Sequence, residues 1–458
     1  MVCVWNCNRH DITVGKNIRK NVNTVLVLDI GTSAYKCGIV KVDGNKLIYS
    51  ATEQFKISCP KEERCEVDFT RCWAYAARVL KKVVKEANRI EAKVEAVLLT
   101  SQAQTFAPVD KKFNPLSGGI VWLDSRAEDE SVILNEKLPD FCLSAGFDSP
   151  KPVLYISKLM WLKRNYPQLF KKTMFFPHIN EYIGYQLTRK FYTDYTNFGM
   201  SGIMDIRTKK FNRKVLKILG LKQPQVPLLY PACGKGFPVK QSVAQKLGLK
   251  SIPLVYYCGN DQSSSASGAG VTHVGDVSIN FGTAMVVYTL TPQPLNEVGE
   301  TQIIGVSPID DKYFVISLES QFGSVIDKFK NTYFPELSYN DVYRMFYGKH
   351  PGLPHSDSSG DIIKIVGDTV VFDGMRTNPY IAGELLIHHF INRVKCHLRE
   401  ISHCVNISKL YVSGGATRSE VWINILRETL PYDIVVAAGQ RDSALIGAAK
   451  IYSNTLVV

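Results

Sequence analysis

The chain has 458 residues, of which 45% are hydrophobic and 21% are charged, as is usual for globular proteins. It contains no run of about 18 uncharged apolar residues, so neither a membrane span nor a membrane partner is expected. The net charge of +13 comes from dispersed Lys and Arg without interleaved aromatic platforms, which favours small anionic substrates over nucleic acid.

The length exceeds what a single hydrophobic core usually supports, so we expect two domains. Residues 1–22 are polar and predict a poorly ordered N-terminal tail. We place an N-terminal domain at 23–254 and a C-terminal domain at 255–458. Near this boundary a second series of strands, turns and helices begins in much the same order as the first.

The first strong pattern is a predicted hairpin within residues 25–40, where two apolar β-type stretches flank a polar bend. The bend holds three small residues, Gly31, Thr32 and Ser33. Their backbone N–H groups and hydroxyls could bind an anion. Asp29 at the end of the first strand and Lys36 beyond the bend add a carboxylate for Mg²⁺ and a cation for phosphate.

Polar residues then follow two predicted strands of the first half. After a helix at 70–92, the buried strand 94–100 ends at Gln102 and Gln104, and the strand 119–123 precedes another polar group. That group comprises Trp122, Asp124 and Arg126. Ligands of open α/β sheets collect at such strand ends. An apolar wall with amides, a carboxylate and a guanidinium suits a polyhydroxylated substrate; the alternative is a salt bridge beside a core tryptophan.

Asp261 is the most informative carboxylate of the second half. The strand 252–258 stops just before it, and a helix of small residues, 262–270, follows. A carboxylate here could merely cap the helix. Alternatively, it is a general base that accepts the proton of a substrate hydroxyl during attack on a phosphate, with the helix start favouring its ionised form.

A second hairpin repeats the first, with Gly282 and Thr283 at the bend of residues 277–288. A long helix at 382–402 and a strand at 409–413 then lead to a glycine turn. The turn comprises Gly414, Gly415 and Ala416, with Ser419 close behind. Glycines let a ligand approach the backbone, which suits the nucleoside end of ATP. Two similar hairpins predict an α/β protein of two duplicated domains with a cleft between them. Both hairpins would bind the same phosphate chain, from opposite sides of the cleft.

The 11 cysteines are scattered, form no C-x-x-C pair, and in several cases lie inside apolar runs. This distribution is typical of free thiols and favours a reducing, cytoplasmic location.

Taken in order, these motifs resemble the FGGY carbohydrate kinases of the actin/hexokinase/Hsp70 superfamily, over roughly residues 25–452. The resemblance rests on the two phosphate hairpins, the 120–126 and 187–194 segments, Gly259 to Asp261, the glycine turn and the closing helix 445–449. The resemblance implies two RNase H-like (actin-like ATPase) domains, ATP with Mg²⁺ in the cleft and a sugar deep in the first domain. It assigns the base to Asp261 and the sugar contacts to the first-half polar groups.

The chain also departs from the family pattern. Ala416 replaces a third glycine, and the stretch 319–383 is short and lacks a visible Gly-Glu-Arg-x-Pro segment. Gln102 is not followed by the Arg-Glu pair of glycerol kinases. The stretch around it also lacks the Met-His-Gly typical of many xylulokinases.

We therefore predict an ATP- and Mg²⁺-dependent kinase for a ketose, with xylulose first. Glycerol, ribulose and gluconate are alternative substrates. A non-catalytic actin-like switch and a nucleotide-hydrolysing relative are alternative functions. A homodimer is compatible with the sequence.

Overall fold

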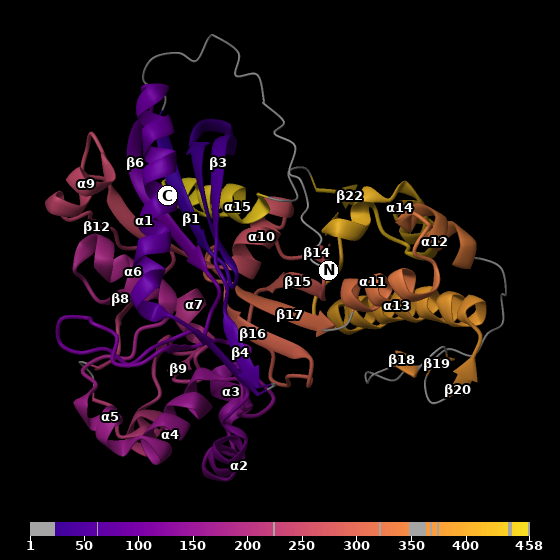
Figure 1. The fold of residues 1–458 in the computed structure, drawn as a ribbon, viewed down its shortest axis with the longest axis horizontal. Coiled ribbons are helices and arrows are strands. Elements are labelled where there is room, and N and C mark those ends of the chain that lie inside the picture. The colour runs from indigo at the N-terminus through magenta and orange to yellow at the C-terminus, as the bar shows by residue number, and fades with distance from the viewer. Residues whose placement is uncertain are drawn as a thin grey trace.

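The computed structural model describes residues 23–61, 63–222, 225–319, 322–347, 363–366, 369–372, 375–437 and 442–456, so the predicted tail 1–22 lies outside it. Two six-stranded sheets dominate the described chain (Figure 1). Smaller two- and three-stranded sheets and a set of helices surround them.

The first sheet has the strand order β12-β13-β6-β1-β2-β3. Its strands are β1 (Asn23–Ile30), β2 (Ala34–Lys41), β3 (Lys46–Gln54), β6 (Lys93–Ser101), β12 (Phe237–Pro238) and β13 (Leu254–Asn260). The three strands β1, β2 and β3 are antiparallel neighbours, whereas β6 runs parallel to both β1 and β13. The carboxyl ends of β1, β6 and β13 therefore meet at one edge, where the predicted polar residues gather.

The second sheet has the order β16-β17-β15-β14-β21-β22. Its strands are β14 (Asp276–Phe281), β15 (Met285–Thr291), β16 (Gln302–Val306), β17 (Tyr313–Glu319), β21 (Lys409–Ser413) and β22 (Ile434–Val436). Here β14, β15 and β17 are antiparallel and β21 runs parallel to β14 and β22, as β6 does to β1 and β13. The repeated order confirms the predicted duplication.

The remaining elements cover the sheets and connect them. The helices are α1 (Phe69–Arg89), α2 (Glu128–Lys137), α3 (Phe141–Ala145), α4 (Tyr155–Asn165), α5 (Pro167–Lys172), α6 (Ile179–Thr188), α7 (Tyr195–Gly199), α8 (Arg213–Leu219), α9 (Gln241–Leu247), α10 (Asp261–Ala269), α11 (Gly323–Tyr333), α12 (Tyr339–Phe346), α13 (Pro379–Ser402), α14 (Glu420–Thr429) and α15 (Ser443–Thr455). The minor strands are β4 (Ser58–Lys61), β5 (Arg64–Val67), β7 (Gly119–Ile120), β8 (Tyr192–Asp194), β9 (Met204–Asp205), β10 (Lys210–Phe211), β11 (Leu228–Tyr230), β18 (Ile363–Val366), β19 (Thr369–Phe372) and β20 (Met375–Thr377). The short 3-10 segments are η1 (Asp43–Asn45) and η3 (Gly415–Arg418).

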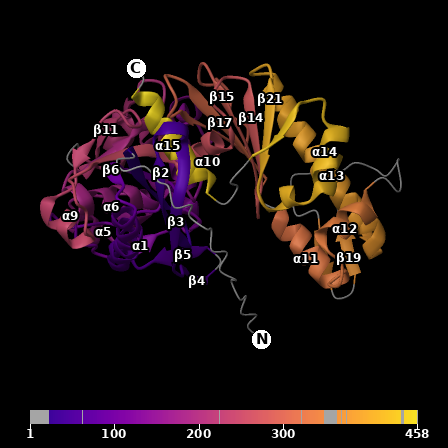
Figure 2. The ribbon, with the colours of Figure 1, turned by 90° about the horizontal axis from the view of Figure 1, so that it is seen from above.

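Helices α10 and α15 pack against each other between the two halves (Figure 2). Helix α15 also contacts β1, β2 and β6 of the first sheet, and α10 contacts β15 and β21 of the second. Small residues allow this close approach, because a Cβ on Gly268 would lie 2.0 Å from the Ser443 carbonyl oxygen and one on Gly447 1.7 Å from that of Ser264. The domain division at 254/255 stays a prediction; it falls inside β13, which begins at Leu254 and pairs within the first sheet.

Helix α1 shows why the sequence folds as predicted in its regular elements. Asp68 accepts the N–H of Thr70 at its start, and one face of the helix is buried against the first sheet, including Ala76, Leu80 and Val83. The predicted strand 119–123 is wrong in extent, because only Gly119–Ile120 is a strand. The chain turns beyond it, and Trp122 is 38% exposed.

The expectation of free cysteines is wrong for one pair, since Cys59 and Cys65 form a disulfide between β4 and β5. Four described cysteines are free and buried, as expected: Cys37, Cys72, Cys233 and Cys258; three others, Cys142, Cys396 and Cys404, are free and at least partly exposed. None of the helices in the described ranges is both long and apolar enough to cross a bilayer.

Candidate active site

Both predicted phosphate hairpins close with a backbone hydrogen bond from the glycine of the bend to a residue three positions on in the first and two positions on in the second. In the first, the Gly31 N–H donates to the Ala34 carbonyl oxygen at 3.1 Å; in the second, the Gly282 N–H donates to that of Ala284, also at 3.1 Å. The bends lie at the ends of β1 and β14, which occupy equivalent positions in their sheets. Each half of the protein therefore has one bend of small residues at the equivalent end of its sheet.

A cavity of about 390 Å³ adjoins the first hairpin. Predicted sugar-binding residues that line it are Gln102, Gln104, Trp122 and Asp261, joined by Thr32 of the hairpin. The Trp122 indole N–H donates to the Thr32 hydroxyl at 2.9 Å, and that hydroxyl donates to the Gln102 side-chain oxygen at 3.2 Å. The phosphate bend and the predicted sugar wall are therefore directly linked.

Asp261 is the first residue of α10 but not its cap. The Asn260 side chain accepts the Ser263 N–H at 2.8 Å and so performs the capping that Asp261 could have performed. One Asp261 oxygen accepts the Gln262 N–H at 2.9 Å, and the half-buried carboxyl group lines the cavity. Burial raises the pKa of Asp261 to about 6. Hydrogen bonds from backbone N–H groups act in the opposite direction but are the smaller effect. This carboxyl group can therefore take up a proton near neutral pH.

Asp29 lies beside this carboxylate at the end of β1. Its Oδ1 atom is buried without a hydrogen-bond partner. Burial, and next the negative charge of Asp261, raise the pKa of Asp29 to about 7, while Lys36 opposes the shift. Lys36 in turn forms an ion pair with Asp442 at 3.4 Å. A buried carboxylate oxygen with no donor is a suitable ligand for a cation.

A second cavity, of about 630 Å³, lies against the second hairpin. Predicted nucleotide-binding residues that line it are Gly282, Thr283, Gly415, Ala416 and Ser419. Gly414 lies just outside the lining, at a φ of 97°, and a Cβ there would lie 2.4 Å from the Phe281 carbonyl oxygen. Only glycine permits the turn to approach the hairpin this closely.

The structure also adds residues to this cavity that the sequence analysis missed. They come from α11, α12 and the preceding turn, within the divergent stretch 319–383, and include Asp327, Ser338, Asn340 and Tyr343. The Ser338–Asp341 capping box is a local signal for the start of α12. It predicts a helix, but not the cavity beside it, because the cavity depends on tertiary packing. Residues 348–362 of this stretch lie outside the described part.

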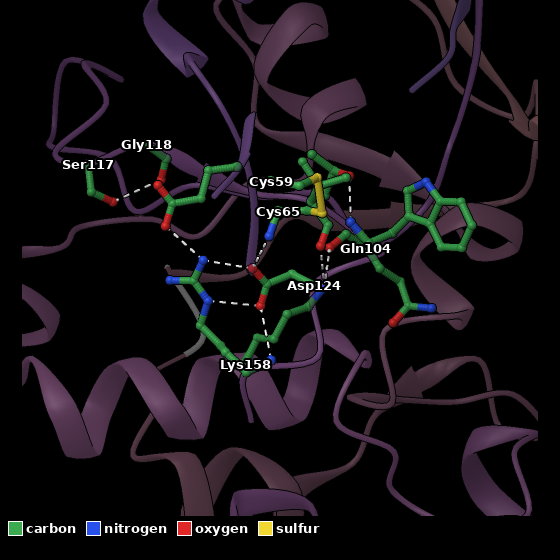
Figure 3. Close-up of polar contacts among 12 residues, drawn as sticks. Cys59, Cys65, Gln104, Ser117, Gly118, Asp124 and Lys158 are labelled. Atoms are coloured by element: carbon green, nitrogen blue, oxygen red, sulfur yellow. Dashed lines mark hydrogen bonds and ion pairs between the residues drawn. A yellow bond between two sulfur atoms is a disulfide. The ribbon is translucent and has the colours of Figure 1, made fainter. Parts of the chain in front are cut away.

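The structure places Asp124 and Arg126 away from the cavity lining. Asp124 is fully buried, and the Arg126 guanidinium donates to both of its carboxylate oxygens at 2.8 and 2.7 Å. Glu66 accepts from the same guanidinium at 2.7 Å, and the Cys65 N–H donates to Asp124 at 2.8 Å. Figure 3 shows Asp124 facing the disulfide-bonded Cys65. The pair thus binds the Trp122 loop to β5, and its contact with sugar stays a prediction.

Lys158 is a further buried cation next to this pair. Its ammonium group, on α4, donates to the carbonyl oxygens of Val121 at 3.0 Å and Gln104 at 3.4 Å. Burial lowers the pKa of Lys158 to about 7, although Asp124 opposes the shift. The lysine joins the two loops that carry the sugar wall. Its place in the polar site was not predicted, because a single lysine in an amphipathic helix resembles any surface residue.

Comparisons with known proteins show what the chain as a whole is similar to. Residues 24–268 match the N-terminal domain of the FGGY family of carbohydrate kinases. A xylulose kinase of Bacillus subtilis (strain 168) is 20% identical over 448 residues, covering 93% of this chain and 87% of that protein. A gluconokinase of the same organism is 20% identical over 451 residues, covering 92% and 85%. The structure of ligand-bound xylulose kinase from Lactobacillus acidophilus has a TM-score of 0.83 at 19% identity, covering 95% of this chain and 90% of that one.

The strand order and the likeness to solved structures show the two-domain actin-like ATPase fold. The chain belongs to the FGGY family of carbohydrate kinases, because the family model spans more than half of it. The predicted family, fold class and enzyme class are thereby confirmed. Such an enzyme uses ATP to phosphorylate a hydroxyl group of a small sugar.

Proposed function

We propose that this kinase transfers the γ-phosphoryl group of ATP to a terminal hydroxyl of a small ketose, with xylulose the first candidate. The main support is the cavity that brings Asp261 together with Gln102, Gln104 and Trp122 beside the first phosphate hairpin. The sugar would lie against Trp122, and its hydroxyl groups would form hydrogen bonds with the side-chain amides of Gln102 and Gln104. The ATP phosphates would lie between the hairpins, with the nucleoside in the second cavity.

Asp261 would act as the general base in this reaction. The substrate hydroxyl oxygen attacks the γ-phosphorus, the bond to the β-bridging oxygen breaks, and ADP leaves. Asp261 accepts the proton released from the hydroxyl. The N–H groups and hydroxyls at the bends, including Thr32 and Thr283, would donate to the phosphate oxygens as charge moves toward ADP.

The residues present also fit a magnesium ion. Asp29 has a buried oxygen without a hydrogen-bond donor and lies near the charge of Asp261. Asp29 would hold the ion directly or through water, because Mg²⁺ is usually bound by one or two carboxylates together with substrate phosphates. A bound Mg²⁺ supplies charge neutralisation on the phosphates.

The charges around the cavity favour a neutral sugar. Among the described residues that line it are two carboxylates, Asp261 and Glu300, and one cation, Lys151. Lys151 already pairs with Asp148 at 3.0 Å and donates to the Glu300 carbonyl oxygen at 2.7 Å. A sugar acid would bring a further negative charge into the cavity. Among the described lining residues, the one cation that could pair with it is already bound to other groups. A ketose or polyol avoids that repulsion.

A coupled ADP-release assay over ketoses, polyols and sugar acids tests the proposal. We expect the highest kcat/KM for a ketopentose and a low value for gluconate. ATP turnover that does not depend on any sugar would indicate a nucleotide hydrolase instead. The absence of turnover with every substrate, despite ATP binding, would indicate a non-catalytic nucleotide switch. The homodimer and the cytoplasmic location stay predictions.

The pH dependence of turnover follows from Asp261. A general base must be ionised, and burial raises the pKa of this carboxyl group to about 6. Its ionised fraction therefore falls as pH drops through 6, and kcat should fall about tenfold per pH unit below that value. The profile should be measured from pH 5 to 8 with saturating sugar, ATP and Mg²⁺. A kcat that stays constant down to pH 5 would contradict the assignment of Asp261.

A further inference from the structure

The strand β13 is irregular just before the proposed base. Tyr257 pairs with Leu99 and Asn260 with Ser101, so two residues of β13 oppose the single residue Thr100 of β6. One of the two is Gly259, which has a φ of 85°. Such a bulge removes a backbone N–H from the strand ladder and changes the direction in which the chain continues. Here the chain continues directly into Asp261.

The buried carboxylate of Asp194 receives the N–H that the bulge releases. Asp194 lies at the end of β8 and is 1% exposed. Its Oδ2 accepts the Gly259 N–H at 3.1 Å, and its Oδ1 accepts the Asn197 N–H at 2.8 Å. The Thr100 hydroxyl donates to the Gly259 carbonyl oxygen at 3.1 Å. Both backbone polar groups of Gly259 are therefore fixed by side chains.

The same segment also holds the strand that carries the sugar-binding amide. The Asn197 side-chain N–H group donates to the Ser101 hydroxyl at 2.9 Å and to the Ser101 carbonyl oxygen at 3.3 Å. Ser101 directly precedes Gln102, whose side chain lines the sugar cavity. Asp194 and Asn197 thus connect the ends of β6 and β13, although neither lines the cavity.

We infer that Asp194 is a positioning residue, which fixes the β13 bulge so that Asp261 points at the substrate hydroxyl. This inference rests on the proposed role of Asp261 as the base. A carboxylate is suited to the task because it offers two acceptor oxygens to two backbone N–H groups. An amide in its place offers one oxygen and two donors, so one N–H of the pair would face another donor.

The substitution Asp194→Asn tests this role with little change in size. We expect kcat to fall about 10²-fold, because a misplacement of about 1 Å can have that effect. The KM for the sugar and the Kd for ATP should change much less, since the cavity lining is intact. Binding of both ligands should be measured by calorimetry, beside a melting curve.

Asp276→Asn is the matched control. Asp276 is 5% exposed and also accepts two backbone N–H groups, but on the single oxygen Oδ2: those of Thr272 at 3.0 Å and His273 at 2.8 Å. It lies at the opposite end of β14 from the second hairpin. Because a single amide oxygen can still accept both N–H groups, we expect Asp276→Asn to lower the melting temperature no more than Asp194→Asn does, with kcat unchanged.

Gly259→Ala disturbs the same bulge while keeping Asp194. A Cβ there would require an unfavourable φ and would lie 3.1 Å from the Thr196 side chain and 3.2 Å from Pro308. We expect a loss of kcat with retained ligand binding, as in Asp194→Asn. The inference is overturned if Asp194→Asn keeps wild-type kcat, if kcat falls equally in the control, or if both bulge variants are recovered only unfolded. Failure of the proposed function would instead appear in the wild type, as an absence of sugar-dependent ADP release.

Discussion

Replacing Asp261 by asparagine is expected to lower kcat by about 10²–10⁴-fold while ATP still binds. The amide keeps the size of the side chain and can still accept the Gln262 N–H, but it cannot accept a proton from the sugar. The cap of α10 remains, because Asn260 supplies it. The fold and the nucleotide cavity should therefore be unaffected. The measurements are single-turnover phosphoryl transfer and calorimetric titration with ATP.

Glu300→Gln is the control for a general effect of charge. Glu300 also lines the sugar cavity but is exposed, so its substitution removes a carboxylate near the cavity without changing a half-buried group. If Asp261 acts as a base, Glu300→Gln should reduce kcat far less than Asp261→Asn. Near wild-type turnover in Asp261→Asn, or equal losses in the two variants, would show that the base lies elsewhere.

The parts of the fold that the sequence predicts are those encoded locally. A Gly-Thr bend between two apolar stretches specifies a hairpin whatever surrounds it, and its recurrence at Gly31 and Gly282 predicts the duplicated sheets. Apolar residues on one face likewise predict α1, and a strand end followed by small residues predicts α10 to within one residue at either end. These patterns depend on neighbouring residues only.

The parts that the sequence does not predict depend on contacts between distant segments. Glu300 reaches the sugar cavity from the loop before β16, and Asn340 reaches the nucleotide cavity from α12. The disulfide of Cys59 with Cys65 joins residues only six positions apart, but it requires the pairing of β4 with β5, which the sequence analysis did not predict. The motif around Asp124 identifies the correct region, but whether a charged side chain faces the ligand or a buried partner is decided by packing.

The substitution Asp124→Ala is expected to have the second large effect, a loss of folding stability. The Arg126 side chain is 5% exposed and would lose its fully buried partner, as would the Cys65 N–H. Removing one member of a buried ion pair typically lowers the free energy of unfolding by roughly 3–5 kcal/mol, and here the buried Arg126 would keep only Glu66, whose side chain is 44% exposed, as a partner. We expect the melting temperature to fall accordingly, and binding of sugar and of ATP to weaken together.

Glu66→Ala is the matched control, because Glu66 pairs with the same guanidinium but is 44% exposed. Exposed pairs contribute about 0–1 kcal/mol, so its melting temperature should stay near that of the wild type. The double substitution Asp124→Leu with Arg126→Met should recover part of the stability lost in Asp124→Ala, since it removes the unpaired charge. If Asp124→Ala instead melts like the wild type, binds ATP normally and loses only kcat/KM for the sugar, then Asp124 recognises the substrate. In that case its pairing with Arg126 would have to open when the sugar binds.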